Sequence, residues 1–367
     1  MDLLQHYQNQ HPLNEFYLPR KAQIPQSDKI NLYGVRGSGK TTLILEYLLE
    51  YDEEELLYID CQDPNLRFTP LDSTPIQAFI QKNSLKLLIL DHYEPSLLEH
   101  LPQVKQIILI TRVALDLEGF SSLELFPLDY EEFLVFERGS SQTTSFNHFL
   151  KLGTLPIMAG STKNGIITLS SFFKSRFDTQ EQSLLILLAH YQTKHITTNQ
   201  LYTYAKERFK VSKDWLYKTI KLFQKEGIIY FINDAYQKGG KKLVLFDFVF
   251  AKYLTMGQPF ITQFDTMIAL ALLKHHIAFE TLGIHGYINT HNELIIPAPF
   301  ESEESIWKKS HSKFALYKKY NINKVTIVTV ANQYSYEIEE IIFEAMPFYE
   351  WSILNEDETI ESINLQG

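Results

Sequence analysis

The sequence predicts an α/β fold in which a doubly wound parallel sheet is followed by a helical domain with a hairpin and by a small second α/β domain. In the first third of the chain, short apolar runs alternate with helical patterns. Such alternation is typical of a parallel sheet with helices on both faces. After residue 179, three helical patterns precede a glycine-tipped hairpin, and the remaining residues mix strands and helices.

The first domain is organised around residues 29–50, KINLYGVRGSGKTTLILEYLLE. Residues 29–33 predict a strand and residues 42–50 a helix. Between them, GVRGSGKT fits G-x-x-x-x-G-K-[ST], a glycine-rich loop whose backbone N–H groups bind a polyphosphate at a helix N-terminus. We therefore predict a site for ATP formed by Gly34, Val35, Arg36, Gly37, Ser38, Gly39, Lys40, Thr41 and Thr42.

A second part of this site follows from the strands that come next, at 55–60, 86–91 and 106–110. Residues 86–91, KLLILD, are almost wholly apolar and end in an acid, which is typical of a strand buried on both faces of a parallel sheet. In P-loop proteins the lysine contacts the β- and γ-phosphates, and the threonine hydroxyl and an aspartate on a neighbouring strand hold Mg²⁺. Thr41 and Asp91 are the predicted metal ligands.

The residues that follow these strands are the candidates for catalysis. Many such ATPases carry glutamate directly after the aspartate, where it orients or deprotonates the attacking water, but this chain has His92 there and Glu94 two residues later. Either residue substitutes for the glutamate, or ATP is bound and hydrolysed slowly. Thr111 is the expected sensor of the γ-phosphate, and Arg112 is either a phosphate ligand or a surface charge. The predicted catalytic residues are Lys40, Asp91, Glu94 and Thr111.

Composition restricts the possible classes of protein. The 367 residues carry a formal net charge of −10, which argues against a general nucleic-acid binder. The single cysteine, Cys61, excludes an internal disulfide framework, and no apolar run approaches ~18 residues. A soluble, cytoplasmic protein without a membrane segment is expected. Arg20, in the segment before the first strand, is interpreted as a solvated charge rather than a nucleotide ligand.

Three segments resemble a known family. Residues 34–43, GVRGSGKTTL, resemble the G-x-R-x-x-G-K-T-T-L loop of a prokaryotic AAA-type P-loop ATPase family. Residues 125–134, LFPLDYEEFL, are similar to its L-x-P-L-S-F-x-E-F-L element, and residues 152–156, LGTLP, are similar to its G-G-x-P turn, with Thr154 in place of the second glycine. The resemblance implies a P-loop domain, a winged helix and a C-terminal restriction-nuclease-like domain of unknown function. His92 departs from the family's acidic pair.

The patterns and the resemblance together predict three domains. Residues 1–178 form a P-loop NTPase domain of AAA type, in which a flexible linker at 139–145 leads to a helical lid at 146–177. Residues 179–255 form a winged-helix domain. Residues 256–367 form a small α/β domain of degenerate nuclease-like type.

The expected winged helix has a local excess of positive charge. Its helices are predicted at 181–191, 198–209 and 213–226, with Thr198 and Ser212 as caps, and its hairpin strands at 228–232 and 241–246. Residues 195–245 contain ten lysines or arginines against four acids. Contact with DNA through the third helix and the hairpin is one interpretation, and packing against the nucleotide domain is the other.

The C-terminal domain lacks the pattern of an active nuclease. Such enzymes hold Mg²⁺ with a carboxylate and an E-x-K sequence on the next strand. Asp265 and Glu293 could be relics of such a site, but residues 295–299, IIPAP, supply no E-x-K. A binding or assembly surface, for a protein partner or a second copy, is expected instead. Two functions remain: an Mg²⁺-dependent ATPase that repositions the later domains, or a slow nucleotide switch that gates DNA or protein binding.

Overall fold

The computed structural model describes residues 3–9, 17–137, 141–160, 165–236 and 239–353. The chain forms two compact units. The first comprises residues 1–127 together with the short segment Lys225–Gly227, and the second comprises residues 128–224 and 228–367. The domain boundaries proposed at residues 178 and 255 stay predictions.

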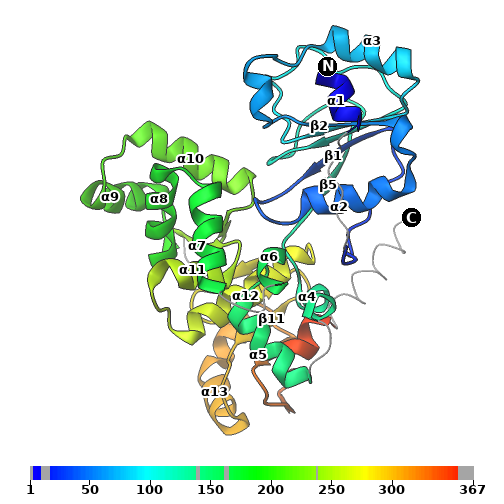
Figure 1. Ribbon diagram of the computed structural model, residues 1–367. Coiled ribbons are helices and arrows are strands. Elements are labelled where there is room, and N and C mark those ends of the chain that lie inside the picture. The colour runs from blue at the N-terminus through cyan, green and yellow to red at the C-terminus, as the bar shows by residue number, and fades with distance from the viewer. Residues whose placement is uncertain (1–2, 10–16, 138–140, 161–164, 237–238, 354–367) are drawn as a thin grey trace. The chain divides into compact units, whose positions relative to one another are not determined.

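The first unit contains a five-stranded parallel sheet with the strand order β2-β3-β4-β1-β5 (Figure 1). This confirms the predicted α/β sheet, and the four strands that were expected appear within one residue of their predicted ends. The fifth, β5, was not located from the sequence. The strands are β1 (Lys29–Tyr33), β2 (Leu56–Asp60), β3 (Leu87–Asp91), β4 (Gln106–Ile110) and β5 (Ser121–Glu124), and the helices are α1 (Leu3–Asn9), α2 (Lys40–Tyr47) and α3 (Ser73–Asn83).

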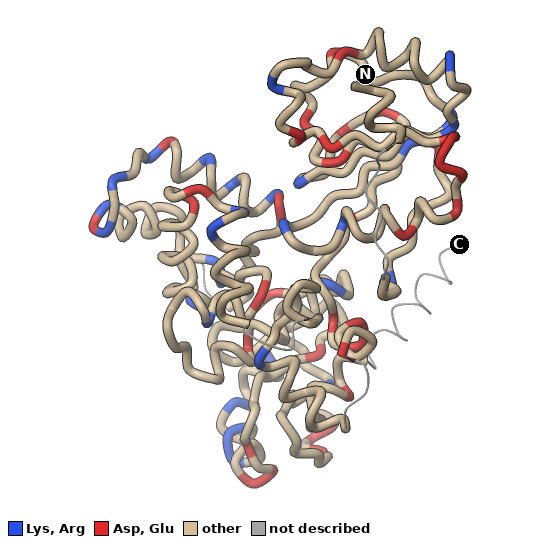
Figure 2. The backbone as a smooth tube through the Cα atoms, in the orientation of Figure 1, with Lys and Arg blue, Asp and Glu red and all other residues tan. Residues whose placement is uncertain are grey.

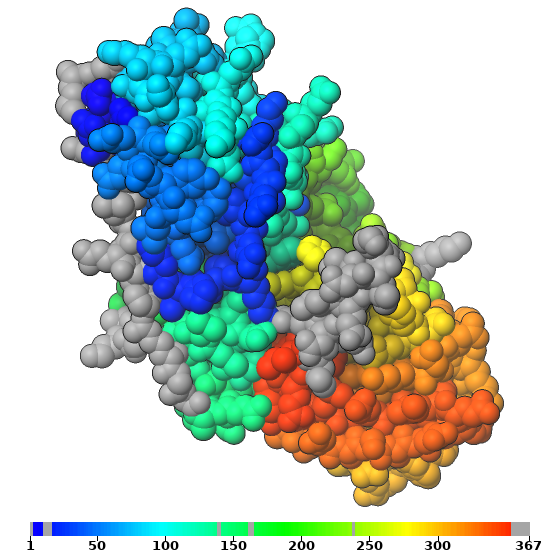
Figure 3. Space-filling model, turned by 90° about the vertical axis from the view of Figure 1, so that its right-hand side faces the viewer, coloured from blue at the N-terminus to red at the C-terminus, as the bar shows by residue number. Residues whose placement is uncertain are grey.

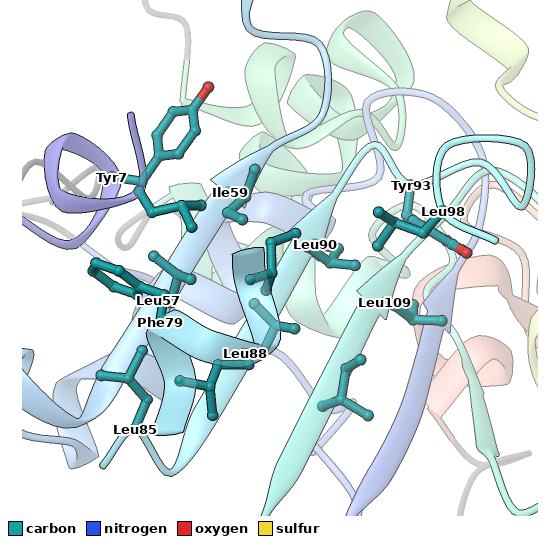
Figure 4. Close-up of a cluster of buried hydrophobic side chains, with 14 residues drawn as sticks. Tyr7, Leu57, Ile59, Phe79, Leu85, Leu88, Leu90, Tyr93, Leu98 and Leu109 are labelled. Carbon is teal, nitrogen blue, oxygen red and sulfur yellow. The ribbon is translucent and has the colours of Figure 1, made fainter. Parts of the chain in front are cut away.

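Both faces of this sheet are covered by apolar side chains. Leu88 and Leu90 of β3 join a core with α1 and α3, which Figure 4 shows, whereas Leu87 and Ile89 join a core with α2 on the opposite face. Successive side chains of a strand point to opposite faces, so a continuous apolar run is needed when both are buried. Each fully buried leucine or isoleucine contributes roughly 1.5–3 kcal/mol of hydrophobic stabilisation. The sheet thereby gives the loops at its carboxyl edge a rigid base.

The second unit begins with a group of helices. A flexible linker at 139–145 was expected, but the prediction is wrong for residues 142–145, which are helical because the Ser141 hydroxyl accepts a hydrogen bond from the Thr144 N–H. Residues 138–140 lie outside the described part. The helices are α4 (Tyr130–Glu137), α5 (Gln142–Leu152), α6 (Pro156–Ala159) and α7 (Gly165–Arg176).

An aromatic cluster joins these helices to the last described residues of the chain. The ring of Phe348 lies 6.2 Å from that of Tyr130, 5.9 Å from that of Phe146 and 6.1 Å from that of Phe149. In Figure 3 the red surface of the last described residues lies beside the green surface of α4 and α5. Aromatic pairs at such distances add to the stabilisation from buried area.

The LGTLP turn at 152–156 has a structural role in the second unit. Thr154 donates from its backbone N–H and its hydroxyl to Asp247 Oδ2, both at 2.6 Å. Asp247 also caps α11 (Phe248–Thr255) by accepting from the Phe250 N–H. Gly153 has a φ of 77°, and a Cβ there would lie 2.5 Å from the Asp247 carboxylate. Only glycine fits this approach, so the turn is explained by packing.

Three helices and a three-stranded antiparallel sheet of order β6-β8-β7 follow. The cap of α9 is Thr197 and not Thr198 as predicted, because Thr197 has the extended backbone from which its hydroxyl reaches the Gln200 N–H. Ser212 caps the next helix as predicted. The elements are α8 (Thr179–His190), β6 (His195–Ile196), α9 (Thr198–Arg208), α10 (Lys213–Lys225), β7 (Ile229–Ile232) and β8 (Lys241–Leu245).

The last part is a six-stranded mixed sheet of order β13-β14-β12-β11-β10-β9. The chain after β7 pairs with it, since the Ala235 N–H donates to the Thr281 carbonyl and the Thr281 N–H donates to the Asn233 carbonyl. The elements are α12 (Phe260–Lys274), β9 (Phe279–Thr281), β10 (Tyr287–Asn289), β11 (Glu293–Pro297), α13 (Glu303–Lys319), β12 (Lys324–Thr329), β13 (Tyr334–Ile338) and β14 (Ile341–Pro347).

No helix in the described ranges combines the length and the apolar character that crossing a membrane requires.

Candidate functional site: the glycine-rich loop and its neighbours

The glycine-rich loop connects β1 to α2 at the carboxyl edge of the parallel sheet. Gly34 has a φ of 144°, and a Cβ on it would lie 2.3 Å from the Leu125 carbonyl oxygen of the chain that passes beside it. Gly39 has a φ of 97° and lies directly before the first residue of α2. Both positions require glycine. The local sequence therefore forms a tight loop that ends at a helix N-terminus.

The Lys40 ammonium lies over this loop. Its Nζ donates to the carbonyl oxygens of Gly34, at 2.7 Å, and Val35, at 3.0 Å. The Ser38 hydroxyl is buried and has no hydrogen-bond partner among the described residues. A buried polar atom without a partner needs an explanation such as a ligand, and phosphate oxygens form stronger, charge-assisted bonds with an ammonium than neutral carbonyls do. The loop thus fits a polyphosphate.

Thr41 and Asp91, the predicted metal ligands, are in direct contact. The Thr41 hydroxyl donates to Asp91 Oδ2 at 2.8 Å, and the Tyr58 hydroxyl donates to the same oxygen at 2.7 Å. Burial, with the neighbouring Asp91 carboxylate, raises the pKa of Tyr58 well above its ordinary value, so its hydroxyl stays a neutral donor. A hydroxyl and a carboxylate are oxygen ligands of the kind that Mg²⁺ prefers.

The described residues contain no cluster of three or more His, Cys, Asp or Glu side chains that could hold a metal. An Mg²⁺ ion at Thr41 and Asp91 would therefore take its other ligands from phosphate oxygens and water, as it usually does beside nucleotides.

His92 lies beside Asp91 at the position where the sequence comparison with P-loop ATPases led us to expect glutamate. Its Nδ1 is 2.9 Å from Asp60 Oδ1 and 3.6 Å from Asp91 Oδ1. The parallel register pairs Asp60 of β2 with Asp91 of β3, which brings both carboxylates to the same edge. His92 has a φ of 54°, a left-handed conformation that is uncommon for histidine and often marks functional sites. Glu94 is exposed in the turn that follows.

Thr111, the predicted sensor, is buried at the end of β4 with its hydroxyl bonded inside the protein. The hydroxyl donates to the Val113 carbonyl at 2.7 Å and accepts from Asn31 Nδ2 at 2.8 Å. Asn31 also accepts from the Leu115 N–H at 2.8 Å. These bonds fix the turn after β4, and the sensing role of Thr111 stays a prediction.

The interpretation of Arg20 as a solvated charge is wrong. Its guanidinium donates from Nη1 to the Ser38 carbonyl at 2.7 Å and from Nη2 to the Phe126 carbonyl at 2.8 Å. Arg20 thus fixes the backbone of the glycine-rich loop against the chain that follows β5. Arg20 lies 18 positions before Ser38 and outside any motif, so the sequence alone could not predict this contact.

Arg36, within the loop, forms a two-bond ion pair with Glu226. Its Nε is 3.0 Å from Oε2 and its Nη2 is 3.3 Å from Oε1, and the two side chains are only 7% and 1% exposed. Arg112 Nη1 lies 4.0 Å from the same Glu226 Oε1. The Arg112 side chain is 43% exposed, and both interpretations of it, phosphate ligand or surface charge, stay open. Glu226 belongs to Lys225–Gly227, the short segment of the first unit.

The comparison with protein families agrees with this geometry. Residues 26–103 match the AAA domain family. The matched part contains the glycine-rich loop, Thr41 and Asp91, and an AAA domain supports ATP binding at a coarse level. No curated protein matches the chain.

Two solved structures show weak similarity to this chain. The Walker-type ATPase of Pyrococcus abyssi has 13% identity and a TM-score of 0.39, with 62% of this chain and 91% of that chain covered. The Drosophila ORC structure bound to AT-rich DNA and Cdc6 has 14% identity and a TM-score of 0.18, with 59% and 81% covered. Neither similarity is close enough to indicate a function.

In the second unit, the two acids considered as relics of a nuclease site are bonded to neighbouring side chains. Asp265 Oδ2 lies 2.6 Å from Lys242 Nζ, and Asp265 Oδ1 accepts a hydrogen bond from the Tyr287 hydroxyl. Glu293 accepts hydrogen bonds from Thr326 and Asn289. Both acids are therefore engaged by neighbouring side chains of the second unit.

Proposed function

We propose that the protein binds ATP together with Mg²⁺ at residues 34–42 and hydrolyses it. The observation that carries this proposal is the contact of Thr41 with Asp91 directly beside a loop whose Lys40 ammonium covers it. Ordinary glycine-rich turns require neither a hydroxyl nor a buried carboxylate at that place. The match of residues 26–103 to AAA domains supports the nucleotide part of the proposal.

Each residue of the site has a separate task in this proposal. Backbone N–H groups of the loop and the Lys40 ammonium bind the phosphates. Thr41 and Asp91 would hold Mg²⁺, which neutralises charge on the phosphates when bound. The Thr41 hydroxyl, which donates to Asp91 in the structure, would then be available as a metal ligand, and Tyr58 would hold the Asp91 carboxylate in its orientation.

Calorimetric titration of the full chain with ATP tests the proposal, once with Mg²⁺ and once with EDTA. Saturable binding that Mg²⁺ strengthens is expected. Absence of saturable binding under both conditions would show that the loop is a structural turn.

Whether the protein is an ATPase or a slow nucleotide switch depends on the role of His92. We propose that His92, held by Asp60, orients the attacking water. His92→Gln is then expected to lower kcat about a hundredfold, the lower end of the usual effect of such a group, without changing ATP affinity. Glu94→Gln is the matched control and is expected to retain kcat, because Glu94 is exposed. Phosphate release measures both variants.

If Glu94→Gln lowers kcat and His92→Gln does not, Glu94 rather than His92 orients the attacking water. If the wild-type protein binds ATP tightly with no measurable phosphate release, the switch is the correct alternative. The absence of glutamate directly after Asp91 favours that alternative as the second candidate.

A second proposed activity is contact with DNA. We infer that α8–α10 with β6–β8 form a winged helix, whose basic segment, residues 206–221, meets phosphates. This segment contains six lysines or arginines against two acids, and all six are exposed, while the whole chain is acidic. In Figure 2 the blue of these residues recurs along α9 and α10. Because the chain after β7 is bonded to Thr281, the helices rather than the hairpin would carry the contact.

Lys218→Glu combined with Lys221→Glu is therefore expected to weaken binding of duplex DNA and to flatten its salt dependence. The slope of log affinity against log salt should fall by about 2, since roughly 0.9 counterion is released per phosphate contact. Fluorescence anisotropy at several salt concentrations measures it. The control is Lys308→Glu with Lys318→Glu, which makes the same charge change on α13.

If the double variant and its control weaken binding equally, the effect is one of overall charge. If the unaltered protein binds no duplex at low salt, the DNA proposal is wrong.

We propose that the C-terminal elements form a restriction-nuclease-like fold that lacks nuclease activity. The order α12, β9, β10, β11, α13, β12, with β11 and β12 parallel, suits that fold. Since Asp265 and Glu293 are bonded internally, we propose that this part is a binding or assembly surface that moves with the nucleotide state.

A further inference from the structure

We propose that Glu226 is an internal competitor of the terminal phosphate of ATP, which holds the nucleotide site in a low-affinity state until a triphosphate displaces it. This inference rests on the proposed ATP site. It concerns a carboxylate that no motif marks, 190 positions from its partner Arg36 in the sequence.

The geometry places one carboxylate against two arginines that flank the site. Arg36 belongs to the glycine-rich loop, four residues before Lys40, and both its Nε and its Nη2 bond Glu226. Arg112 directly follows Thr111 at the end of β4, and its Nη1 lies 4.0 Å from Oε1. The two cations therefore come from the glycine-rich loop of the proposed site and from the turn after β4, where Thr111 is the predicted sensor of the γ-phosphate.

A carboxylate and a terminal phosphate are recognised in the same way by arginine. The guanidinium presents two parallel N–H groups that fit either anion. Because the Glu226 and Arg36 side chains are 1% and 7% exposed, water screens their interaction little. A phosphate that enters the loop brings more negative charge than the carboxylate carries. It attracts both arginines and repels Glu226.

Displacement of Glu226 would affect the turn that joins α10 to β7. Glu226 lies in Lys225–Gly227, which joins the end of α10 to β7, and Gly227 has a φ of 71°. The next residue, Ile228, donates its N–H to the Phe223 carbonyl at 2.8 Å and so closes the end of the helix. When Glu226 loses its arginines, this turn loses the ion pairs that tie it to the glycine-rich loop and to Arg112, and the change can pass along the covalent chain. ADP lacks the terminal phosphate that would compete with Glu226 for the two arginines.

Hydrogen–deuterium exchange of the wild-type protein gives a readout that needs no turnover. The peptide that spans residues 223–230 is compared without nucleotide, with Mg²⁺–ADP and with the Mg²⁺ complex of the non-hydrolysable analogue AMP-PNP. Faster exchange of the Ile228 amide is expected with AMP-PNP than with ADP or without nucleotide. Exchange that slows or stays unchanged with bound AMP-PNP would overturn the proposal.

The variant Glu226→Gln keeps the shape of the side chain and removes its charge. Without nucleotide, its 223–230 peptide is expected to exchange as fast as that of the AMP-PNP-bound wild type. Its AMP-PNP affinity should rise about tenfold, within the range of about 5- to 150-fold that coupled sites usually show. The matched control is Glu132→Gln, which neutralises an equally buried carboxylate paired with Lys274 in the second unit. It should change neither quantity.

Failure of this inference differs from failure of the proposed function. If wild-type and Glu226→Gln proteins bind AMP-PNP equally well, the ATP site stands and the competition is wrong. If the wild-type protein binds no nucleotide, both are wrong. Should Glu226→Gln fail to fold, the wild-type exchange experiment still decides the matter.

Discussion

Lys40→Ala is expected to reduce ATP affinity, and any turnover, by about two to three orders of magnitude. This is the usual effect of removing one preorganised group that stabilises negative charge in an active site. The ammonium lies on the carbonyls of Gly34 and Val35, within the loop that would surround the phosphates. Its removal leaves the phosphate charge without its principal cation. Titration with labelled ATP and assays of phosphate release measure both quantities.

Lys86→Ala is the control for this substitution. Lys86 is half exposed and pairs with Glu55 beside β3, so its removal changes net charge equally and touches no residue of the proposed site. If Lys40→Ala binds ATP as the control does, the loop does not bind phosphate through its lysine, and the proposed site is wrong.

Asp91→Asn is expected to abolish the contribution of Mg²⁺ and leave weak, metal-independent binding. The amide still accepts hydrogen bonds from Thr41 and Tyr58 through its oxygen but lacks the negative charge that the cation needs. The affinity in Mg²⁺ should fall to the value in EDTA, and phosphate release should fall about a hundredfold or more. Titrations with and without the metal measure the first effect.

Asp60→Asn is the informative comparison, because Asp60 pairs with Asp91 in the strand register and lies at the same edge. In Asp60→Asn, Mg²⁺ should still strengthen ATP binding. If Mg²⁺ also strengthens ATP binding in Asp91→Asn, the metal is held by other groups. Thermal unfolding of both variants shows whether the fold is intact.

The parts of the site that the sequence predicts are those in which local spacing determines geometry. The glycine-rich loop and the apolar strand that ends at Asp91 each constrain their own backbone, and β2, β3 and β4 follow from apolar runs. Tyr58, Asn31 and Glu226 could not be found in this way, since each acts on a partner brought near by the fold. Asn31 alone left a trace, as a polar residue inside an apolar strand.

Errors at the ends of elements have equally physical causes. Thr197 and Thr198 are identical in chemistry, and only the backbone angles of Thr197 decide which hydroxyl caps α9. The composition of 139–145 resembles a linker, yet Ser141 begins a helix. Residues 245–254, LFDFVFAKYL, form an apolar run without clear periodicity, so α11 was not predicted.

The backbone pairing between the chain after β7 and Thr281 has a mechanical consequence. These two backbone hydrogen bonds form a single bridge that ties the segment following α10 and β7 to the edge of the six-stranded sheet. If ATP alters the turn at Gly227 as proposed, we therefore expect the change to reach the edge of the six-stranded sheet as well as the helices.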